Sequence, residues 1–243
     1  MFAGPNGSGK SVLKSYLPEP LLGVYLNPDD IEKAVRDCGY VDMHSFGIQT
    51  TAAEVLAVFT HSEFLIHQGL AEAAGGLSFS DGRLYFPLHV INSYFASVLA
   101  DFLRQQLLAA RRTFTFETVM SHPGKVELLQ KAQEAGYRTY LYYVATDDPA
   151  INVSRVENRV KLNGHDVDPD RVEKRYYRSL DLLLSAIRFT NRAYIFDNST
   201  DNADHNHTWL AEITEGRRLE LKTDQIPAWF KRAVLDKIDQ PTF

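Results

Sequence analysis

The chain has 243 residues, of which 44% are hydrophobic and 23% are charged. This composition is typical of a folded soluble protein, and the length suits one large domain or one domain with an insertion. The formal net charge of -5 argues against a nucleic-acid backbone as the main partner. No run approaches the ~20 apolar residues of a membrane span, and the single Cys38 excludes an internal disulfide framework. We therefore expect a cytoplasmic protein with no nucleic-acid or membrane partner.

The predicted elements alternate between strands and helices. In chain order, apolar runs and helical periodicity predict a strand at 1–3, a helix at 11–16, a strand at 23–26, helices at 28–37, 50–69 and 90–110, a strand at 113–117, a helix at 126–135, a strand at 138–145, helices at 150–162 and 169–189, a strand at 193–196 and a helix at 227–238. This order predicts an α/β fold with a mainly parallel sheet and helices on both faces. Segment 75–89 breaks the helical pattern, and its glycine-containing pairs indicate an irregular loop or a small hairpin.

Residues 4–11 read Gly-Pro-Asn-Gly-Ser-Gly-Lys-Ser, which is the complete phosphate-binding pattern G-x-x-x-x-G-K-[ST]. Its glycines let the backbone turn tightly and point N–H groups at nucleotide phosphates. Lys10 can place its ammonium against the β- and γ-phosphates of ATP, and Ser11 can hold Mg²⁺ through its hydroxyl. The predicted nucleotide contacts are Gly4, Asn6, Gly7, Ser8, Gly9, Lys10 and Ser11. Only three residues precede the loop, so the first strand is very short or the chain starts late.

Two acidic residues follow the predicted strand at 23–26. In parallel α/β sheets, ligands bind at the carboxyl ends of the strands, where the phosphate loop also lies. Asp29 could therefore accept the proton of a substrate hydroxyl that attacks the γ-phosphate. The alternative is that Asp29 and Asp30 only complement the dipole of the helix at 28–37, which Asn27 caps. The residues alone leave both interpretations open.

The strand at 113–117 ends in an acid that is followed by hydroxyl residues. Glu117 could orient the substrate or a metal-bound water at the same edge of the sheet. Thr118 and Ser121 could hydrogen-bond the substrate. The alternative is a strand end that simply meets solvent.

Basic residues concentrate in one stretch of this acidic chain, and they are Arg155, Arg159, Lys161, Arg171, Lys174, Arg175 and Arg178. The first two are four residues apart and share a helix face, and the arginines of the next helix share another. The polar segment 161–166 joins the two helices. Two arginine-bearing helices with a mobile connection are typical of a lid that closes over phosphates. The alternative is a pair of solvated helix faces.

The region after Thr200 gives a weak signal, apart from the predicted helix at 227–238. His205 and His207 lie in its polar first segment. They could bind a metal, but two exposed loop histidines are usually only solvated, and we expect that here.

Together, these segments resemble the zeta toxin family of phosphate-loop kinases. The resemblance covers roughly 1–40 and 90–200, and its motifs occur in the same order along the chain. The motifs lie at 3–11, 26–29, 114–121, 136–138, 155–160, 164–167, 175–180 and 194–199. Their combination in this order is far more specific than the phosphate loop alone.

The resemblance implies a kinase that uses ATP and Mg²⁺ to phosphorylate the 3′-hydroxyl of the amino sugar in UDP-N-acetylglucosamine. It implies that Lys10 and Ser11 serve ATP and the metal, and that Asp29, in the family's Asn-x-Asp segment, is the base. The substrate-binding residues are then Asp30, Glu117, Thr118 and Ser121. The lid charges are Arg171 and Arg175 with a catalytic role and Arg155 and Arg159 for the nucleotide. Toxin members of the family also imply an antitoxin protein as a partner.

The chain departs from the family pattern at two places. Pro28 replaces the usual small residue before the acid, and the stretch from about Val41 to His89 is longer than the resemblance leads us to expect. We therefore expect one P-loop kinase domain over 1–243, with an insertion at about 41–89 and a lid at about 150–180. The insertion neighbours the expected acceptor pocket.

Two other functions fit the same residues. One is a nucleotide-gated binding switch, which would hydrolyse ATP without an acceptor and dock a partner on the lid or on segment 75–89. The other is a kinase for another small hydroxyl acceptor, such as an antibiotic or a nucleoside. An inactive scaffold is disfavoured because Lys10, Ser11, Asp29 and Glu117 occur together.

Overall fold

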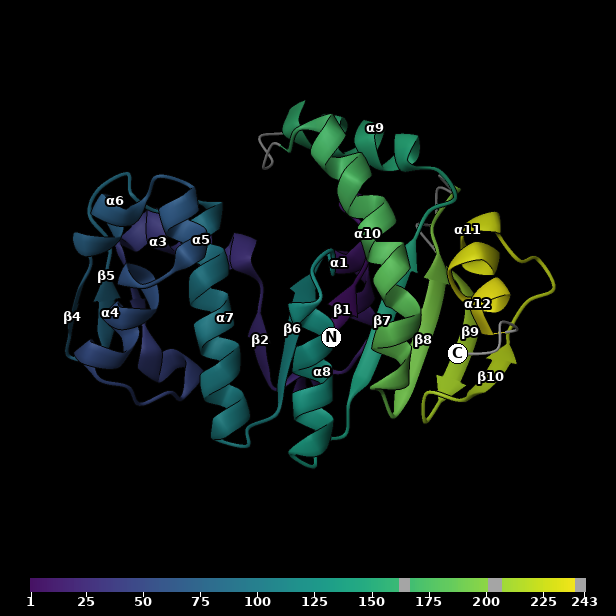
Figure 1. Cartoon of the computed structure of the whole chain (residues 1–243), viewed down its shortest axis with the longest axis horizontal. Helices are drawn as coiled ribbons and strands as arrows, with labels where there is room; N and C mark the ends of the chain where they lie inside the picture. The colour runs from purple at the N-terminus through teal and green to yellow at the C-terminus, as the bar shows by residue number, and fades with distance from the viewer. Residues whose placement is uncertain (162–166, 201–206, 239–243) are drawn as a thin grey trace. The chain divides into compact units, whose positions relative to one another are not determined.

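The computed structural model describes residues 1–161, 167–200 and 207–238 (Figure 1). The chain divides into two compact units, and each is described by itself. Unit 1 comprises Met1–Pro18 and Glu117–Phe243, and unit 2 comprises Glu19–Phe116. Most of the predicted mobile segment 161–166, together with His205, lies outside the described residues.

Unit 1 contains the phosphate loop and most of the strands. Its elements are β1 (Phe2–Ala3), α1 (Lys10–Leu13), η1 (Lys14–Tyr16), α8 (Gly124–Glu134), β7 (Tyr140–Ala145), α9 (Pro149–Lys161), α10 (Pro169–Arg188), β8 (Arg192–Asp197), β9 (Thr208–Thr214), β10 (Arg218–Leu221), α11 (Ala228–Phe230), η3 (Lys231–Leu235) and α12 (Asp236–Ile238). It also holds the carboxyl end of β6 (Phe114–Thr118).

Unit 2 contains the predicted insertion. Its elements are α2 (Glu19–Leu22), β2 (Val24–Leu26), α3 (Pro28–Cys38), β3 (Tyr40–Asp42), η2 (Met43–Phe46), α4 (Ala52–Thr60), α5 (Glu63–His67), α6 (Ala71–Gly75), β4 (Ser78–Ser80), β5 (Arg83–Tyr85), α7 (Ser93–Ala109) and the first residues of β6.

The main sheet has seven strands in the order β10-β9-β8-β7-β1-β6-β2. The pairs β2–β6, β6–β1, β1–β7 and β7–β8 are parallel, which confirms the predicted mainly parallel sheet. The last two strands, β9 and β10, are antiparallel and were not predicted. Phe2 pairs with both Glu117 and Tyr142, so the short strand β1 lies between β6 and β7.

The core of unit 1 lies between its strands and two long helices. Figure 1 shows α10 in front of β7 and β8, with α8 beside it. Tyr143 of β7 and Tyr176 of α10 are fully buried, as is Trp229 near the carboxyl end. The tyrosine hydroxyls are paired, because that of Tyr143 lies 3.0 Å from the Ser179 hydroxyl and that of Tyr176 donates to the Thr146 carbonyl oxygen at 2.6 Å. Burial therefore leaves neither phenol without a partner.

Unit 2 has its own aromatic core. The rings of Phe59, Phe86 and Phe95 lie 6.1–6.3 Å apart, and all three side chains are buried. A three-stranded antiparallel sheet in the order β3-β5-β4 packs beside them. Strands β4 and β5 form the predicted small hairpin, whose turn residues Asp81 and Gly82 have φ angles of 49° and 74°. Such values are typical of the two-residue turns that match the twist of a hairpin.

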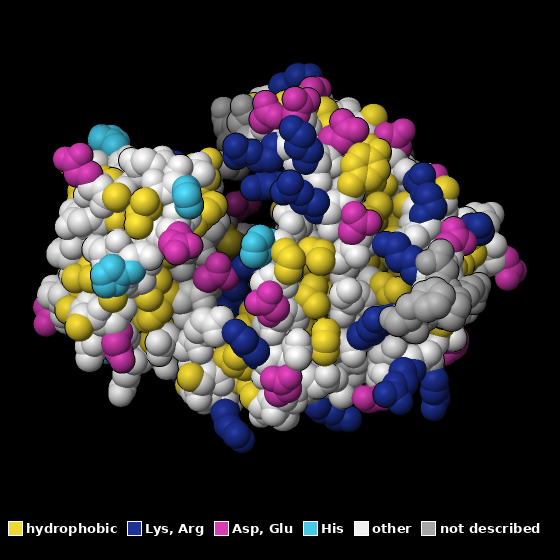
Figure 2. All heavy atoms as spheres, viewed as in Figure 1, with side chains coloured by type: hydrophobic (Ala, Val, Ile, Leu, Met, Phe, Trp, Pro, Cys, Tyr) yellow, Lys and Arg dark blue, Asp and Glu magenta, His cyan; other side chains and the backbone are white. Residues whose placement is uncertain are grey.

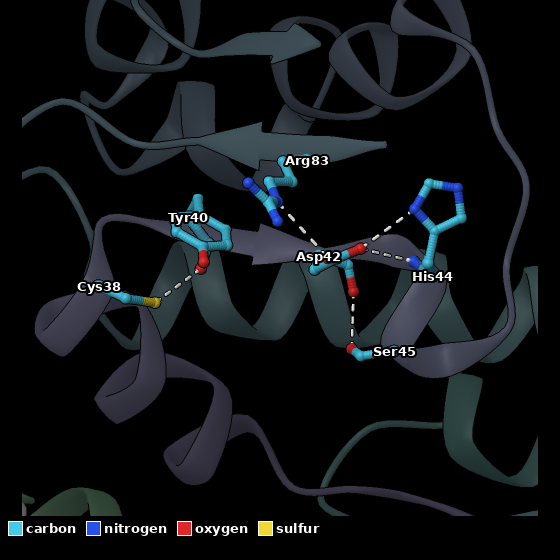
Figure 3. Close-up of polar contacts among 6 residues, drawn as sticks. All are labelled: Cys38, Tyr40, Asp42, His44, Ser45 and Arg83. Atoms are coloured by element: carbon cyan, nitrogen blue, oxygen red, sulfur yellow. Dashed lines mark hydrogen bonds and ion pairs between the residues drawn. The ribbon is translucent and has the colours of Figure 1, made fainter. Parts of the chain in front are cut away.

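The outer face of this small sheet carries a polar cluster (Figure 3). The Asp42 carboxylate accepts hydrogen bonds from the backbone N–H of His44 at 2.9 Å and from its ring Nδ1 at 3.2 Å, and its other oxygen lies 3.5 Å from Arg83 Nε. The Arg83 guanidinium also lies 4.9 Å from the ring centre of Tyr40. These contacts join the turn after β3 to β5, but they are solvent-exposed and contribute little free energy individually.

Two predicted helices have different boundaries in the structure. The single helix predicted at 50–69 is wrong, because α4 ends at Thr60 and α5 begins at Glu63. The Ser62 hydroxyl caps α5 by accepting a hydrogen bond from the Leu65 N–H. This cap starts a new helix, so α4 does not continue through Ser62. The helix predicted at 227–238 consists of three short stretches, α11, η3 and α12, with the middle one in π-helical geometry.

Two glycines of unit 2 give a matched stability test. Gly23 and Gly39 have φ angles of 59° and 80°. A Cβ atom on Gly39 would have open space, whereas one on Gly23 would lie 2.3 Å from the Thr113 carbonyl oxygen. We expect Gly39→Ala to lower the free energy of unfolding by about 1–2 kcal/mol, from the left-handed backbone alone. Gly23→Ala should lower it by about 1–3 kcal/mol more, because backbone must move. Equal losses in denaturant unfolding would contradict this packing.

Candidate active site

The phosphate loop is held in a backbone conformation that requires glycine. Gly4, Gly7 and Gly9 have φ angles of 143°, 71° and 93°. A Cβ atom on Gly4 would lie 2.0 Å from the Val144 carbonyl oxygen. On Gly7 it would lie 2.6 Å from the carbonyl oxygen of Asn152. The loop therefore lies too close to neighbouring backbone of the same chain for any residue but glycine at these positions. A backbone that cradles phosphates needs such glycines.

Lys10 lies folded over this loop. Its Nζ donates to the carbonyl oxygens of Gly4 at 2.9 Å and Pro5 at 2.8 Å. The ammonium is therefore held at the loop that the sequence predicts to bind phosphate. Ser8 is fully buried, and neither its Oγ nor Asn6 Oδ1 has a hydrogen-bond partner among the described residues. These atoms fit a site that takes an additional polar group.

Ser11 and Glu117 meet beside the loop. The Ser11 hydroxyl donates to Glu117 Oε2 at 3.4 Å, and the Glu117 side chain is 8% exposed. The parallel pairing of β1 with β6 places Glu117 opposite Phe2, immediately before the loop. A hydroxyl and a carboxylate are oxygen ligands of the kind that Mg²⁺ prefers. The structure thus brings together two of the residues that the sequence singles out, the predicted metal ligand and a predicted substrate contact.

Two asparagines brace the loop, and the sequence analysis missed both. Buried Asn152, at the start of α9, donates from Nδ2 to the Asn6 carbonyl oxygen at 2.5 Å and accepts from the Thr146 hydroxyl. Asn198, directly after β8, donates from Nδ2 to the Ser8 carbonyl oxygen at 2.9 Å. Both follow strands on the β7 side of β1, so the available signal was polar residues after two strand ends.

A second set of contacts supports Asn198. The carboxylate of Asp197 accepts hydrogen bonds from Trp229 Nε1 and from the Ser199 hydroxyl, both at 2.7 Å. The Ser199 hydroxyl accepts from the backbone N–H of Asp147 at 2.8 Å. The buried Trp229 therefore ties the carboxyl-terminal segment to the ends of β7 and β8. Asn198, which braces the loop, is therefore held in place by residues that are distant from the loop in the sequence.

The predicted lid arginines occupy different environments. Arg155 donates from Nη1 to the Asn198 carbonyl oxygen at 2.8 Å, which links it to the loop support, whereas Arg159 is exposed on α9. The basic residues of α10 line one open hollow of about 400 Å³ with two acids, and the lining is Asp168, Asp170, Arg171, Lys174, Arg175 and Arg178. Figure 2 shows lysine and arginine side chains gathered on this part of unit 1. The arginines predicted to share a face of α10 do line the same hollow.

The remaining predicted residues are placed as follows. Asp29 and Asp30 are exposed in the first turn of α3, in unit 2, where the Asn27 side chain caps the helix by accepting from the Asp29 N–H at 3.0 Å. The Thr118 hydroxyl accepts from the Met120 N–H at 3.0 Å, which shapes the turn after β6. Ser121 is partly exposed in that turn.

His207 differs from the expectation of a solvated loop histidine. It is only partly exposed, and its Nδ1 lies 2.8 Å from the Tyr16 hydroxyl. Burial lowers its pKa below the ordinary value. Within the described ranges, no group of three or more His, Cys, Asp or Glu side chains is arranged to hold a metal. Nor does any helix there combine the length and the apolar composition needed to cross a bilayer.

The bracing role of Asn152 is testable with a neighbour on the same helix. Asn152→Ala removes the hydrogen bonds that its side chain makes with the Asn6 carbonyl and the Thr146 hydroxyl, so the free energy of unfolding should fall by about 1–3 kcal/mol. Asn158→Ala, at an exposed position of α9, should change it by less than about 0.5 kcal/mol. Denaturant unfolding measures both, and similar effects of the two changes would mean that Asn152 does not brace the loop.

Comparisons with known proteins give a family match and similar solved structures. The Zeta toxin family model matches residues 90–209. The fold is similar to a chain of the AvrRxo1-ORF1:AvrRxo1-ORF2 complex, crystallised with sulphate ions, at a TM-score of 0.50 and 14% identity, over 92% of this chain and 60% of that one. A chain of the PezAT chromosomal toxin–antitoxin system of Streptococcus pneumoniae gives a TM-score of 0.43 and 13% identity, over 96% and 81%.

An uncharacterized protein of Haemophilus influenzae is 32% identical over 63 residues, which are 26% of this chain and 45% of that relative. The chain thus spans less than half the length of this relative and 60% of the AvrRxo1 chain. The first residue of the family match lies just before α7, so the phosphate loop itself precedes the matched region. That loop, the mostly parallel seven-stranded sheet and the match of residues 90–209 to the Zeta toxin model together support assignment of the chain to the zeta toxin family.

Proposed function

We propose that the chain is an ATP-dependent kinase that transfers the γ-phosphate to a hydroxyl group of a small molecule. The observation that carries the proposal is the loop at Gly4–Ser11, whose backbone is built as a phosphate cradle with Lys10 held over it. Phosphoryl transfer needs mainly positioning and charge neutralisation, and such a loop supplies both.

Mg²⁺ fits the oxygen groups beside the loop. Ser11 would hold it through the hydroxyl that now lies 3.4 Å from Glu117. The metal would supply positive charge at the β- and γ-phosphates. Glu117 would then orient a metal-bound water or the substrate. Lys10 would turn from the loop carbonyls to the phosphates, as its flexible stem allows.

Asp29 is the proposed base. It follows β2, whose last residue Leu26 pairs in parallel with Phe116 of β6, and ligands of such sheets bind beyond the carboxyl ends of the strands. Its carboxylate is exposed and so free to accept a proton. In the reaction, the acceptor oxygen forms a bond to the γ-phosphorus, the bond from that phosphorus to the β-phosphate oxygen breaks, and the hydroxyl proton passes to Asp29. ADP leaves.

The lid arginines complete the proposal. Arg171 and Arg175, which share the open hollow on α10, would stabilise the charge of the transferring group. Arg155 and Arg159 on α9 would contact the nucleotide. Arg155 already reaches the segment that braces the loop, because it donates to the Asn198 carbonyl.

The resemblance to the zeta toxin family suggests the acceptor. We propose UDP-N-acetylglucosamine, phosphorylated at the 3′-hydroxyl of its amino sugar. The residues assigned to bind it are Asp30, Glu117, Thr118 and Ser121. Because the sequence resembles toxins of this family, we also propose an antitoxin protein as a partner.

The activity is testable by transfer of label from γ-labelled ATP to a panel of nucleotide sugars in the presence of Mg²⁺. Lys10→Ala should lower kcat/KM by about 10²–10³-fold, because the positive charge of Lys10 that would stabilise the transferring phosphate is lost. Asp29→Asn should lower kcat by about 10²–10⁴-fold, because no group takes the proton.

Matched controls are Lys131→Ala on the exposed side of α8 and Asp37→Asn at the far end of α3, and both should retain the activity. Full activity of Asp29→Asn would refute its role as the base. Release of labelled phosphate without any labelled acceptor would favour the nucleotide-gated switch.

A further inference from the structure

His207 packs directly against the phosphate loop, although it lies almost two hundred positions away along the chain. Its Nδ1 is 2.8 Å from the hydroxyl of Tyr16, which belongs to the helical turn that continues from the loop. The two rings meet edge to face, with centres 5.7 Å apart and an interplanar angle of 83°. The Phe196 ring lies 6.2 Å away on another side. The imidazole is therefore held in place by its neighbours.

The other ring nitrogen faces the loop backbone. His207 Nε2 lies 2.9 Å from the position that a Cβ atom on Gly9 would take. This nitrogen is buried and makes no hydrogen bond of good geometry among the described residues, although the Gly9 backbone lies near enough to the ring to raise its pKa. It thus packs against the backbone of the loop that the motif assigns to phosphate.

The surroundings of the ring favour its neutral form. Burial lowers the pKa of His207, the backbone of Gly9 acts in the opposite direction, the Arg155 charge lowers the pKa further, and the Asp197 carboxylate raises it. The Asn198 amide, which also lies against Gly9, presents N–H donors rather than acceptors. The charged groups that act on the ring are thus the Arg155 cation and the Asp197 carboxylate. Among the described residues, no carboxylate contacts Nε2.

We propose that His207 takes up a proton when a phosphorylated nucleotide binds to the loop, so that nucleotide affinity increases as the pH falls. This inference rests on the proposed nucleotide binding, and it couples that binding to the protonation of His207. The phosphates bring several negative charges to the backbone against which Nε2 packs, and nearby negative charge favours an imidazolium. The proton comes from solvent, and the only bond formed is the new N–H of the ring.

The contact with Tyr16 allows this change. A phenol hydroxyl can donate to Nδ1 of a neutral ring and can accept from the N–H of a charged one. The ring can therefore gain its charge without leaving its place. Because linkage is reciprocal, a nucleotide that favours the imidazolium must bind more tightly to the protonated protein. Each unit by which the nucleotide raises the pKa corresponds to about a tenfold gain in affinity at low pH.

Calorimetry of the full chain with the magnesium complex of a non-hydrolysable ATP analogue tests the proposal. Titrations at about pH 6, in two buffers of different ionisation enthalpy, give the number of protons taken up. The wild type should take up a larger fraction of a proton than His207→Gln. Its affinity relative to that variant should rise as the pH falls. Tyr16→Phe keeps the imidazole and should keep the uptake.

Equal proton uptake by the wild type and His207→Gln, with binding intact, would overturn this inference and leave the proposed function standing. Absence of binding in the wild type would remove the proposed function and the inference together. If His207→Gln does not fold, NMR titration of the His207 ring in the wild type decides the matter: a midpoint that the analogue raises supports the inference, and an unchanged midpoint refutes it.

Discussion

The close approach between the phosphate loop and the ends of β7 and β8 is the constraint on which the site depends. The backbone of Gly4 passes the Val144 carbonyl, and that of Gly7 passes Asn152, at distances that exclude a Cβ atom. The side chains of Asn152 and Asn198 then hydrogen-bond the loop from outside. Because the loop's own short strand has two residues, this external bracing rather than a long strand fixes its shape.

The bracing joins parts of unit 1 that are distant in sequence. The carboxyl-terminal Trp229 is buried and donates to Asp197, the residue before Asn198, so packing of the last segment bears on the first loop. Arg155 reaches the same segment from α9. Unit 2 has its own aromatic core, and Asp29 lies at the start of its capped helix α3.

Much of this could be predicted from the sequence, where local signals are strong. The loop motif marks its own backbone, and apolar runs locate the parallel strands. The break at Ser62 was missed because an apolar pattern continues through it, whereas the capping hydroxyl ends one helix and starts another. Strands β9 and β10 were missed although they form a local antiparallel pair, in which Arg218 pairs with Thr214, because charged and polar residues interrupt their short apolar runs. Asn152 and His207 could not be assigned, since only the fold brings them to Gly7 and Gly9.

Amide hydrogen exchange of the full chain, with and without Mg²⁺ and ATP, tests the central claim most directly. A phosphate bound in the cradle should slow exchange at the amides of residues 7–11, and the segments around Asn152 and Asn198 that brace the loop should be protected with it. Unchanged exchange across all three segments at saturating ATP would contradict the account.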